Sequence, residues 1–205
     1  MPKDTFYRLS TSKQSHIEQK AKQVFLNVPY TNVNIAMIIK AADIPRGSFY
    51  QYFTSLEDLY QHLFVITLEA YETKHLEKVL KTTKKHTLHT WALESFASDY
   101  AFLSTSDHII LLGKFFKERK MMNISLEFMK ERQEQFFQKL LNILDLKVLS
   151  SLEADKILKL MHWIQHIKFQ KIHKIINESE TYKQAYQDYR FFVDVLYKGA
   201  RELYA

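Results

Sequence analysis

A short run of basic, polar and aromatic residues has the chemistry of a nucleic-acid interface. It reads Arg46-Gly47-Ser48-Phe49-Tyr50-Gln51-Tyr52-Phe53. Arginine can hydrogen-bond the edge of guanine through two donors, and glutamine can pair with adenine in the same bidentate way. Arg46 and Gln51 are therefore the candidate base-reading residues. For Arg46, a contact to phosphate or a purely solvated side chain explains the residue equally well.

Small and polar residues near this run are candidate contacts to the DNA backbone. Ser48 and Asn34 can bind phosphate oxygens, and Asn34 can at the same time cap a helix. Lys40 either reaches the DNA backbone or is an ordinary surface lysine. Gly47 leaves room for the close approach of DNA, unless packing between helices is what excludes a side chain at this position.

The elements around these residues are predicted to be two helices joined by a tight turn. Apolar residues at helical spacing between residues 35 and 42 indicate a short helix that begins after Asn34. Asp43 falls where the turn favours a positive φ angle, which aspartate tolerates better than most residues. Pro45 suits the start of the next helix because its fixed φ and missing N–H cost little there. Such a helix-turn-helix can place its second helix in the major groove of DNA.

The rest of the chain is predicted to be helical as well. Its 205 residues are 46% hydrophobic, enough for a sizeable core, and none of its three prolines follows residue 45. Apolar periodicity and polar connections predict helices at 12–27, 55–81, 87–103, 106–118, 123–144, 153–177 and 180–203. We therefore expect an all-α protein. A three-helix DNA-binding domain with the helix-turn-helix spans residues 1–54, and a larger helical domain for effector binding and dimerisation spans residues 55–205.

Charge is placed as a phosphate-binding module requires. The whole chain carries a formal net charge of +6, and residues 1–54 hold seven basic and three acidic side chains. The chain has no cysteine, which excludes disulfides and thiolate chemistry. It has neither a signal-like N-terminus nor an apolar run long enough to span a bilayer, so we expect a cytoplasmic protein without a membrane partner.

Residues 34–59 resemble the DNA-binding domain of TetR-family transcriptional regulators. In that family a capped helix ends in two small residues. A turn, a basic-Gly-Ser/Thr run with aromatic residues, and Ser-Lys-Glu-Asp-Leu then follow. The counterparts here are Ala41-Ala42, Arg46-Gly47-Ser48-Phe49-Tyr50-Gln51-Tyr52-Phe53 and Ser55-Leu56-Glu57-Asp58-Leu59. The resemblance implies that Tyr50 and Tyr52 touch phosphates or thymine methyl groups, unless one of them packs inside.

Three residues depart from the family pattern. Asp43 replaces the usual turn glycine, Pro45 replaces a usual Ser or Thr, and Leu56 replaces a lysine that often holds the phosphate backbone. The chain therefore lacks one hydroxyl group and one ammonium group that commonly contact the DNA backbone in the family.

The resemblance also implies a homodimer that binds a palindromic double-stranded DNA operator. Two recognition helices would read half-sites about 34–36 Å apart, or a multiple of that distance. We expect the last two helices of each subunit to form the dimer surface as a four-helix bundle. The expected apolar stripes are Ile157, Leu160, Met161 and Ile164, then Tyr182, Ala185, Tyr186, Tyr189, Val193, Leu196, Tyr197 and Ala200 with Phe192 adjoining. The alternative is that both stripes are internal core.

The larger domain is expected to bind a small-molecule effector, as the resemblance implies. A small apolar or aromatic effector would release a repressor from DNA, although an activator is also compatible with the sequence. Candidate ligand-binding residues are Tyr71, His75, His162 and His166, of which the last two lie on one helical face. A histidine in an aromatic pocket can ligate haem iron, so a haem- or porphyrin-sensing repressor of an efflux system is an alternative. We expect no required cofactor and no metal site.

Two other classes of protein are the remaining alternatives: a helical enzyme, and a protein-interaction module that does not bind DNA. The sequence contains no phosphate-binding glycine loop, no Gly-x-Ser-x-Gly elbow and no catalytic cysteine. A plain interaction module would not need the run from Arg46 to Phe53 or the local positive charge. We therefore predict a transcriptional regulator and not an enzyme.

Overall fold

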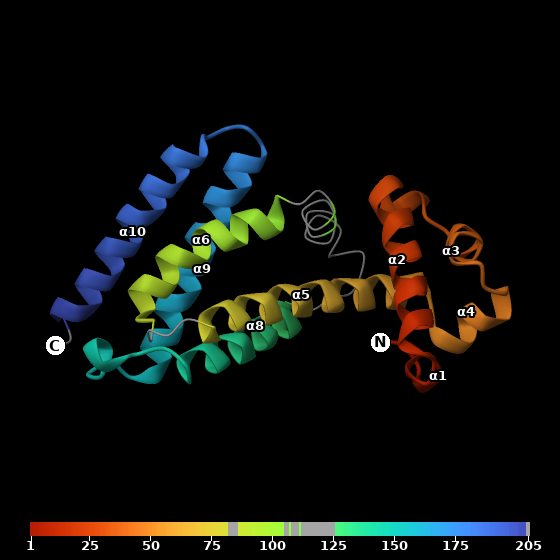
Figure 1. Ribbon diagram of the computed structural model, residues 1–205, viewed down its shortest axis with the longest axis horizontal. Helices are drawn as coiled ribbons and strands as arrows, with labels where there is room; N and C mark the ends of the chain where they lie inside the picture. The colour runs from red at the N-terminus through yellow and green to blue at the C-terminus, as the bar shows by residue number, and fades with distance from the viewer. Residues whose placement is uncertain (82–85, 105–106, 108–110, 112–125, 204–205) are drawn as a thin grey trace. The chain divides into compact units, whose positions relative to one another are not determined.

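The computed structural model describes residues 1–81, 86–104, 107, 111 and 126–203. Within these residues the chain forms α-helices and short 3₁₀ helices and no β-strand, so the all-α prediction is confirmed (Figure 1). None of the helices in this part of the chain is long and apolar enough to cross a membrane. The predicted helix over 106–118 lies outside the described residues apart from 107 and 111, as do residues 123–125 of the helix predicted after it.

The chain divides into two compact units. The first comprises Met1–Tyr71 and Thr105–Ser125, and the second comprises Glu72–Ser104 and Leu126–Ala205. Helix α5 (Leu56–Leu80) begins in the first unit and ends in the second. The division expected after residue 54 lies at the start of this helix, whereas packing divides the chain further along it.

The first unit is built from short helices near the N-terminus. They are α1 (Asp4–Tyr7), α2 (Thr11–Asn27), the 3₁₀ helix η1 (Tyr30–Asn32), α3 (Ile35–Ala42) and α4 (Arg46–Tyr52). Helix α3 packs on α2, and α4 packs on α3 and α1 (Figure 1). The predicted helix over 12–27 and the helix-turn-helix are confirmed, whereas α1 and η1 were not expected from the sequence.

An aromatic core packs against the buried face of α4. Phe49 and Phe53 are fully buried, and the Phe53 ring packs against Phe6 with ring centroids 5.0 Å apart. Tyr30 stacks on Tyr60 with ring centroids 4.7 Å apart in the same unit. Full burial of a large apolar side chain contributes about 1.5–3 kcal/mol, so this core fixes a helix that is too short to be stable alone.

The second unit is a cluster of longer helices. It contains α6 (Leu88–Leu103), α8 (Leu126–Leu141), the 3₁₀ helix η2 (Lys147–Leu149), α9 (Ala154–Ile176) and α10 (Tyr182–Leu203). Helices α9 and α10 pack against each other, α6 packs against both, and α8 packs against α9 (Figure 1). The helices predicted at 87–103, 153–177 and 180–203 are confirmed to within two residues at each end.

The apolar stripes expected at the dimer surface lie mostly inside the second unit. Ile157, Met161 and Ile164 of α9 are buried, and so are Ala185, Tyr189, Val193 and Ala200 of α10. The interpretation of these residues as internal core is therefore the correct one, because α10 turns this face toward α6 and α9. Phe192, which was predicted to adjoin the α10 stripe, is 44% exposed. Three apolar residues outside the predicted stripes also face solvent, namely Trp163, Phe191 and Val195, which are 60%, 64% and 53% exposed.

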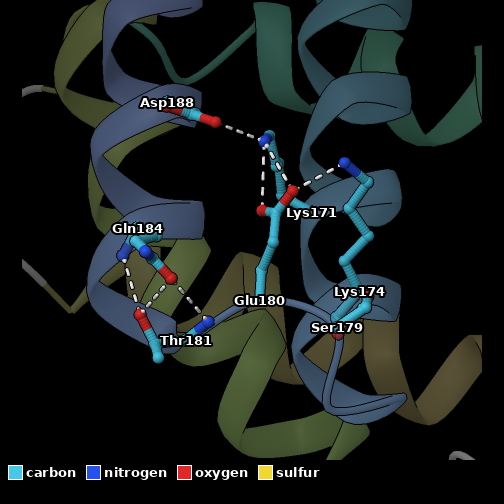
Figure 2. Close-up of polar contacts among 7 residues, drawn as sticks. All are labelled: Lys171, Lys174, Ser179, Glu180, Thr181, Gln184 and Asp188. Carbon is cyan, nitrogen blue, oxygen red and sulfur yellow. Dashed lines mark hydrogen bonds and ion pairs between the residues drawn. The ribbon is translucent and has the colours of Figure 1, made fainter.

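Charged side chains fix the turn between α9 and α10 (Figure 2). The Lys171 ammonium donates to both carboxylate oxygens of Glu180, at 3.2 and 3.1 Å, and to Asp188 at 2.6 Å. Lys174 also donates to Glu180, at 2.6 Å. Glu180 follows α9 and Asp188 belongs to α10, so these contacts tie the end of one helix to the start of the next.

Side chains cap the starts of α5 and α10. Ser55 accepts a hydrogen bond from the Asp58 N–H at 3.2 Å, and the Asp58 carboxylate accepts from the N–H and hydroxyl of Thr54 at 2.8 and 3.0 Å. Before α10, the Thr181 hydroxyl accepts from the backbone N–H of Gln184, and the side-chain amide oxygen of Gln184 accepts from the backbone N–H of Thr181 (Figure 2). This reciprocal pair is a capping box, which satisfies donors that the first turn leaves open.

Candidate nucleic-acid interface

Helix α4 presents one face to solvent and buries the other. Arg46, Gly47 and Gln51 are exposed, and Tyr50 is 41% exposed. The guanidinium carbon of Arg46 lies 5.8 Å from the centre of the Tyr50 ring, a cation–π arrangement. The outer face therefore carries a cation, an aromatic hydroxyl and an amide, which are the groups that a major-groove surface uses.

Tyr52 lies on the opposite face of α4. It is 6% exposed, and its ring meets Phe6 edge-on with centroids 6.0 Å apart. Residues two apart on a helix do not share a face, so Tyr50 and Tyr52 cannot both point outward. Of the two tyrosines considered as DNA contacts, Tyr50 lies at the surface and Tyr52 supports the helix from inside.

The other predicted contacts surround the turn. The side-chain oxygen of Asn34 accepts from the Met37 N–H at 3.1 Å, so Asn34 caps α3 as predicted. Asn34 is exposed, which leaves its amide accessible. Lys40 is exposed in the last turn of α3, and Ser48 is half-buried in α4. These residues and the outer face of α4 thus belong to the same two helices.

The turn itself takes the conformation that the sequence predicts. Asp43 has φ 49° and ψ 52°, in the left-handed region, and the Ile44 N–H donates to the Ile39 carbonyl at 3.1 Å. This bond closes the helix end in a Schellman motif, which usually uses glycine at the left-handed position. The Nε2 atom of His16, on α2, lies 3.2 Å from the Ala42 carbonyl oxygen. A second carbonyl group in the last turn of α3 therefore has a partner.

Gly47 has open space where a side chain would begin. A Cβ atom built on Gly47 would meet no other heavy atom within 4 Å. Packing between the helices therefore does not exclude a side chain at this position. The close approach of DNA at this residue stays a prediction.

The candidate effector-binding residues lie on two helices. Tyr71 and His75 are buried one turn apart on α5, and His162 and His166 are four residues apart on α9. The Nδ1 atom of His162 lies 2.8 Å from the Leu158 carbonyl oxygen of its own helix, whereas His166 is exposed. Within the described residues, no group of three or more His, Asp or Glu side chains could hold a metal ion.

His75 belongs instead to a buried polar network that the sequence did not reveal. Its Nε2 atom is 2.7 Å from the Trp91 indole nitrogen, and its Nδ1 atom is 3.1 Å from the Asp99 carboxylate. The other Asp99 oxygen pairs with the Lys168 ammonium at 2.5 Å, and Lys168 also donates to the Ser95 hydroxyl at 2.8 Å. Lys168 is fully buried, so Asp99 supplies the charge partner that a buried ammonium requires.

The network shifts the pKa values of its charged members. Burial on its own would raise the pKa of the Asp99 carboxyl, but Lys168 and His75 together outweigh it and hold the pKa below its ordinary value. Burial lowers the pKa of Lys168, and the Asp99 carboxylate opposes that effect. Because Asp99 and Lys168 lie on different helices and far apart in the sequence, no local spacing signal could have identified them as partners.

A small cavity adjoins this network within the second unit. Its volume is about 20 Å³, and its walls are formed by His75, Lys78, Val79, His86, Trp91, Glu94, Ser95 and Ser98. His75 is the only residue of the four effector candidates among these lining residues. The cavity combines an indole ring with hydroxyl, imidazole and ammonium groups.

The geometry of the first unit defines a helix-turn-helix protein whose second helix presents a polar, basic surface. Comparison with known proteins agrees with this class. Residues 17–63 match the family model described as bacterial regulatory proteins, tetR family. No curated protein sequence matches the chain significantly.

Solved structures with similar folds cover nearly the whole chain. The crystal structure of a protein described as a TetR-family transcriptional regulator from Syntrophomonas wolfei is 17% identical, covers 92% of this chain and 96% of its own, and gives a TM-score of 0.69. A TetR-family regulator from Marinobacter aquaeolei is 15% identical, covers 89% of this chain and 94% of its own, and gives 0.65. At this identity the likeness shows the fold alone, and the match to the family model is confined to residues 17–63. The chain therefore has a region, residues 17–63, that matches the TetR-family model, within an all-α fold similar to that of solved TetR-family regulators.

Proposed function

We propose that this protein is a dimeric, ligand-responsive repressor that binds a palindromic DNA operator in the cytoplasm. The observation that carries the proposal is the outer face of α4, where Arg46, Gly47, Tyr50 and Gln51 are exposed above a fully buried aromatic underside. Arg46 and Gln51 would read base edges. Asn34, Lys40 and Ser48 would contact phosphates, which supply affinity that falls with added salt.

A second copy of the chain would complete the DNA-binding surface. One recognition helix buries too little surface for tight and specific binding, and a two-fold dimer supplies a second one. The exposed apolar residues of α9 and α10, led by Trp163, Phe192 and Val195, support a homodimer through the last two helices. Aromatic residues exposed to this extent are typical of interfaces. The ion pairs of Lys171 in Figure 2 would keep the two helices in a fixed arrangement.

The effector would bind in the second unit, next to the buried network. His75 and Trp91 line the cavity there, and the cavity would have to widen for an apolar or aromatic molecule to pack on the indole ring. The effector would favour a conformation in which the two recognition helices no longer match the half-site spacing. The resulting change in DNA affinity can be no larger than the difference in effector affinity between the two conformations.

The alternative of a haem or porphyrin sensor receives less support from the described residues. Both ring nitrogens of His75 are already engaged, by Trp91 and Asp99. His162 and His166 lie on α9 and do not line the cavity. The residues present do not fit a haem group in this conformation. An absorbance titration with haemin decides the point, because a Soret shift that is lost in His75→Ala, His162→Ala or His166→Ala would favour the sensor and name the ligand.

Binding to the DNA upstream of the protein's own gene tests the main proposal. A mobility-shift titration at about 50 mM and 200 mM salt should show a specific complex at both concentrations, with affinity falling steeply as salt rises. An unrelated DNA of equal length is the control. If upstream and unrelated DNA bind equally well at low salt, the protein does not repress its own gene or the genes beside it. Reporter expression with and without the protein then separates a repressor from an activator.

A further inference from the structure

The last turn of the recognition helix is closed by residues from the N-terminal arm, Lys3–Phe6. A helix leaves its last four carbonyl groups without partners inside the helix, and for α4 these belong to residues 49–52. The Phe49 carbonyl accepts from the Phe53 N–H at 2.8 Å. The remaining three carbonyls belong to Tyr50, Gln51 and Tyr52. The side chains of Tyr50 and Gln51 lie on the proposed DNA-binding face, and Tyr52 follows them.

All three of those carbonyls accept hydrogen bonds from the arm. The Lys3 ammonium donates to the Tyr50 carbonyl at 2.7 Å, and the Lys3 N–H donates to the Tyr52 carbonyl at 2.8 Å. The Thr5 hydroxyl donates to the Gln51 carbonyl. The arm therefore does for α4 what a C-capping motif normally does for a helix, although it lies more than forty residues away in the sequence.

The arm is itself anchored to the core of the first unit. Phe6 is fully buried, and its ring packs against Phe53 at 5.0 Å and against His62 at 5.4 Å between centroids. The Phe6 N–H also donates to the Lys3 carbonyl at 2.8 Å, which holds the arm in its helical turn. Lys3 adds a positive charge at the negative end of the α4 dipole.

We infer that Lys3 and Thr5 are positioning residues for DNA recognition. They fix the backbone of Tyr50, Gln51 and Tyr52, and with it the direction in which the Gln51 and Tyr50 side chains leave the helix. A helix of seven residues is too short to be stable alone in water, so the arm adds to the aromatic core in holding the base-reading end of α4. This inference rests on the proposed function, because it concerns how that same surface is held.

Substitutions at Thr5 test the inference most cleanly. Thr5→Val removes the hydroxyl donor at nearly constant shape, and Thr5→Ser keeps it. We expect Thr5→Val to weaken binding to the operator by about three- to tenfold, the effect of one lost hydrogen bond, while binding to unrelated DNA stays nearly unchanged. Thr5→Ser should restore operator affinity. Thr31→Val, at another exposed hydroxyl of the same unit, is the matched control and should change neither.

A second measurement does not depend on DNA binding. Backbone amides of α4 should exchange with solvent faster in Thr5→Val and in Lys3→Met than in the unchanged protein, and the amides of α2 should not. If exchange in α4 is unchanged in both variants, the arm does not hold the helix and the inference is wrong. If exchange rises but operator and unrelated DNA lose affinity equally, the arm is structural only, which also overturns it. If the unchanged protein binds no DNA specifically, the proposed function fails, yet the exchange rates still report whether the arm closes α4.

Discussion

The indole N–H of Trp91 points at Nε2 of His75, with 2.7 Å between the two nitrogens. An indole nitrogen can only donate, so Nε2 of His75 must be the acceptor and its proton must lie on Nδ1. That proton then faces the Asp99 carboxylate at 3.1 Å. His75 is thus a neutral ring that links an indole to a buried ion pair, and its lone pair is not available to a metal while this contact lasts.

The ion pair of Asp99 and Lys168 predicts strongly non-additive effects of mutation. Asp99→Asn or Lys168→Met alone should lower the free energy of unfolding by about 3–5 kcal/mol, since each leaves an uncompensated buried charge or a broken network. The double variant should cost clearly less than the sum of the two. Urea unfolding of all four proteins at one protein concentration measures the cycle. Additive losses would mean that the two groups do not depend on each other for burial.

The same pair predicts a loss of stability in acid. The folded pKa of Asp99 is below the ordinary value, so the unfolded chain takes up a proton at this group first. The contribution of Asp99 is therefore fully present above the unfolded pKa of about 3.9 and is lost as the pH falls through the folded value. Urea midpoints measured from pH 7 downward should begin to decrease once the pH drops below about 5. This decrease should be shallower in Asp99→Asn. An equally steep fall in the variant would assign the acid sensitivity to other carboxylates.

Local signals made the helix-turn-helix predictable from the sequence. Asn34 is a good cap, Asp43 tolerates the left-handed turn, and Pro45 can precede the first turn of a helix. Each of these residues affects only the backbone within a few positions along the chain, so its role can be predicted from the local sequence. The long helices were predictable for a similar reason, because no proline after residue 45 interrupts the apolar periodicity.

Features that depend on partners distant in sequence were not predictable. Helix α1 is one turn long and shows no periodicity, and its residue Thr5 donates to a carbonyl group of α4. The burial of Lys168 depends on Asp99 from α6, and lysine is rarely buried. The α10 stripe was periodic, but periodicity does not say whether an apolar face meets the core or a second subunit. Tyr189 at 0% exposure and Phe192 at 44% show that α10 has apolar residues on both faces.

Arg46 and Gln51 should control which DNA sequence is bound. Arg46→Ala and Gln51→Ala should each cost about 1–3 kcal/mol of operator binding and relax the preference at one base pair of each half-site. Lys40→Ala should instead weaken all DNA sequences alike and lower the salt dependence by about one unit of slope. Fluorescence anisotropy with single-base operator variants at two salt concentrations measures both. If the base preference is unchanged in Arg46→Ala, then Arg46 does not read a base and instead contacts phosphate or solvent.

The exposed face of α10 should control dimerisation. Phe192→Glu places a charge in the proposed interface, and a two-fold interface contains the change twice, so the dimer dissociation constant should rise about a hundredfold or more. Sedimentation velocity over a concentration series measures it. Val148→Glu is the matched control, an exposed apolar residue of the same unit at 46% exposure on η2. A dimer that persists in Phe192→Glu would place the interface on another surface.

Gly47→Ala should separate folding from DNA binding. The Cβ atom meets nothing within 4 Å in the free protein, and alanine favours a helix over glycine, so the free energy of unfolding should stay constant or rise by up to about 1 kcal/mol. DNA affinity should nevertheless fall, by about tenfold or ~1.4 kcal/mol, because the added methyl group meets the DNA backbone. Gly199→Ala on α10 has the same open surroundings and should leave DNA affinity unchanged. Anisotropy and urea unfolding of the two variants give the comparison. If Gly47→Ala binds the operator as tightly as the unchanged protein, then α4 does not approach DNA closely at this residue, and the glycine has no role in recognition.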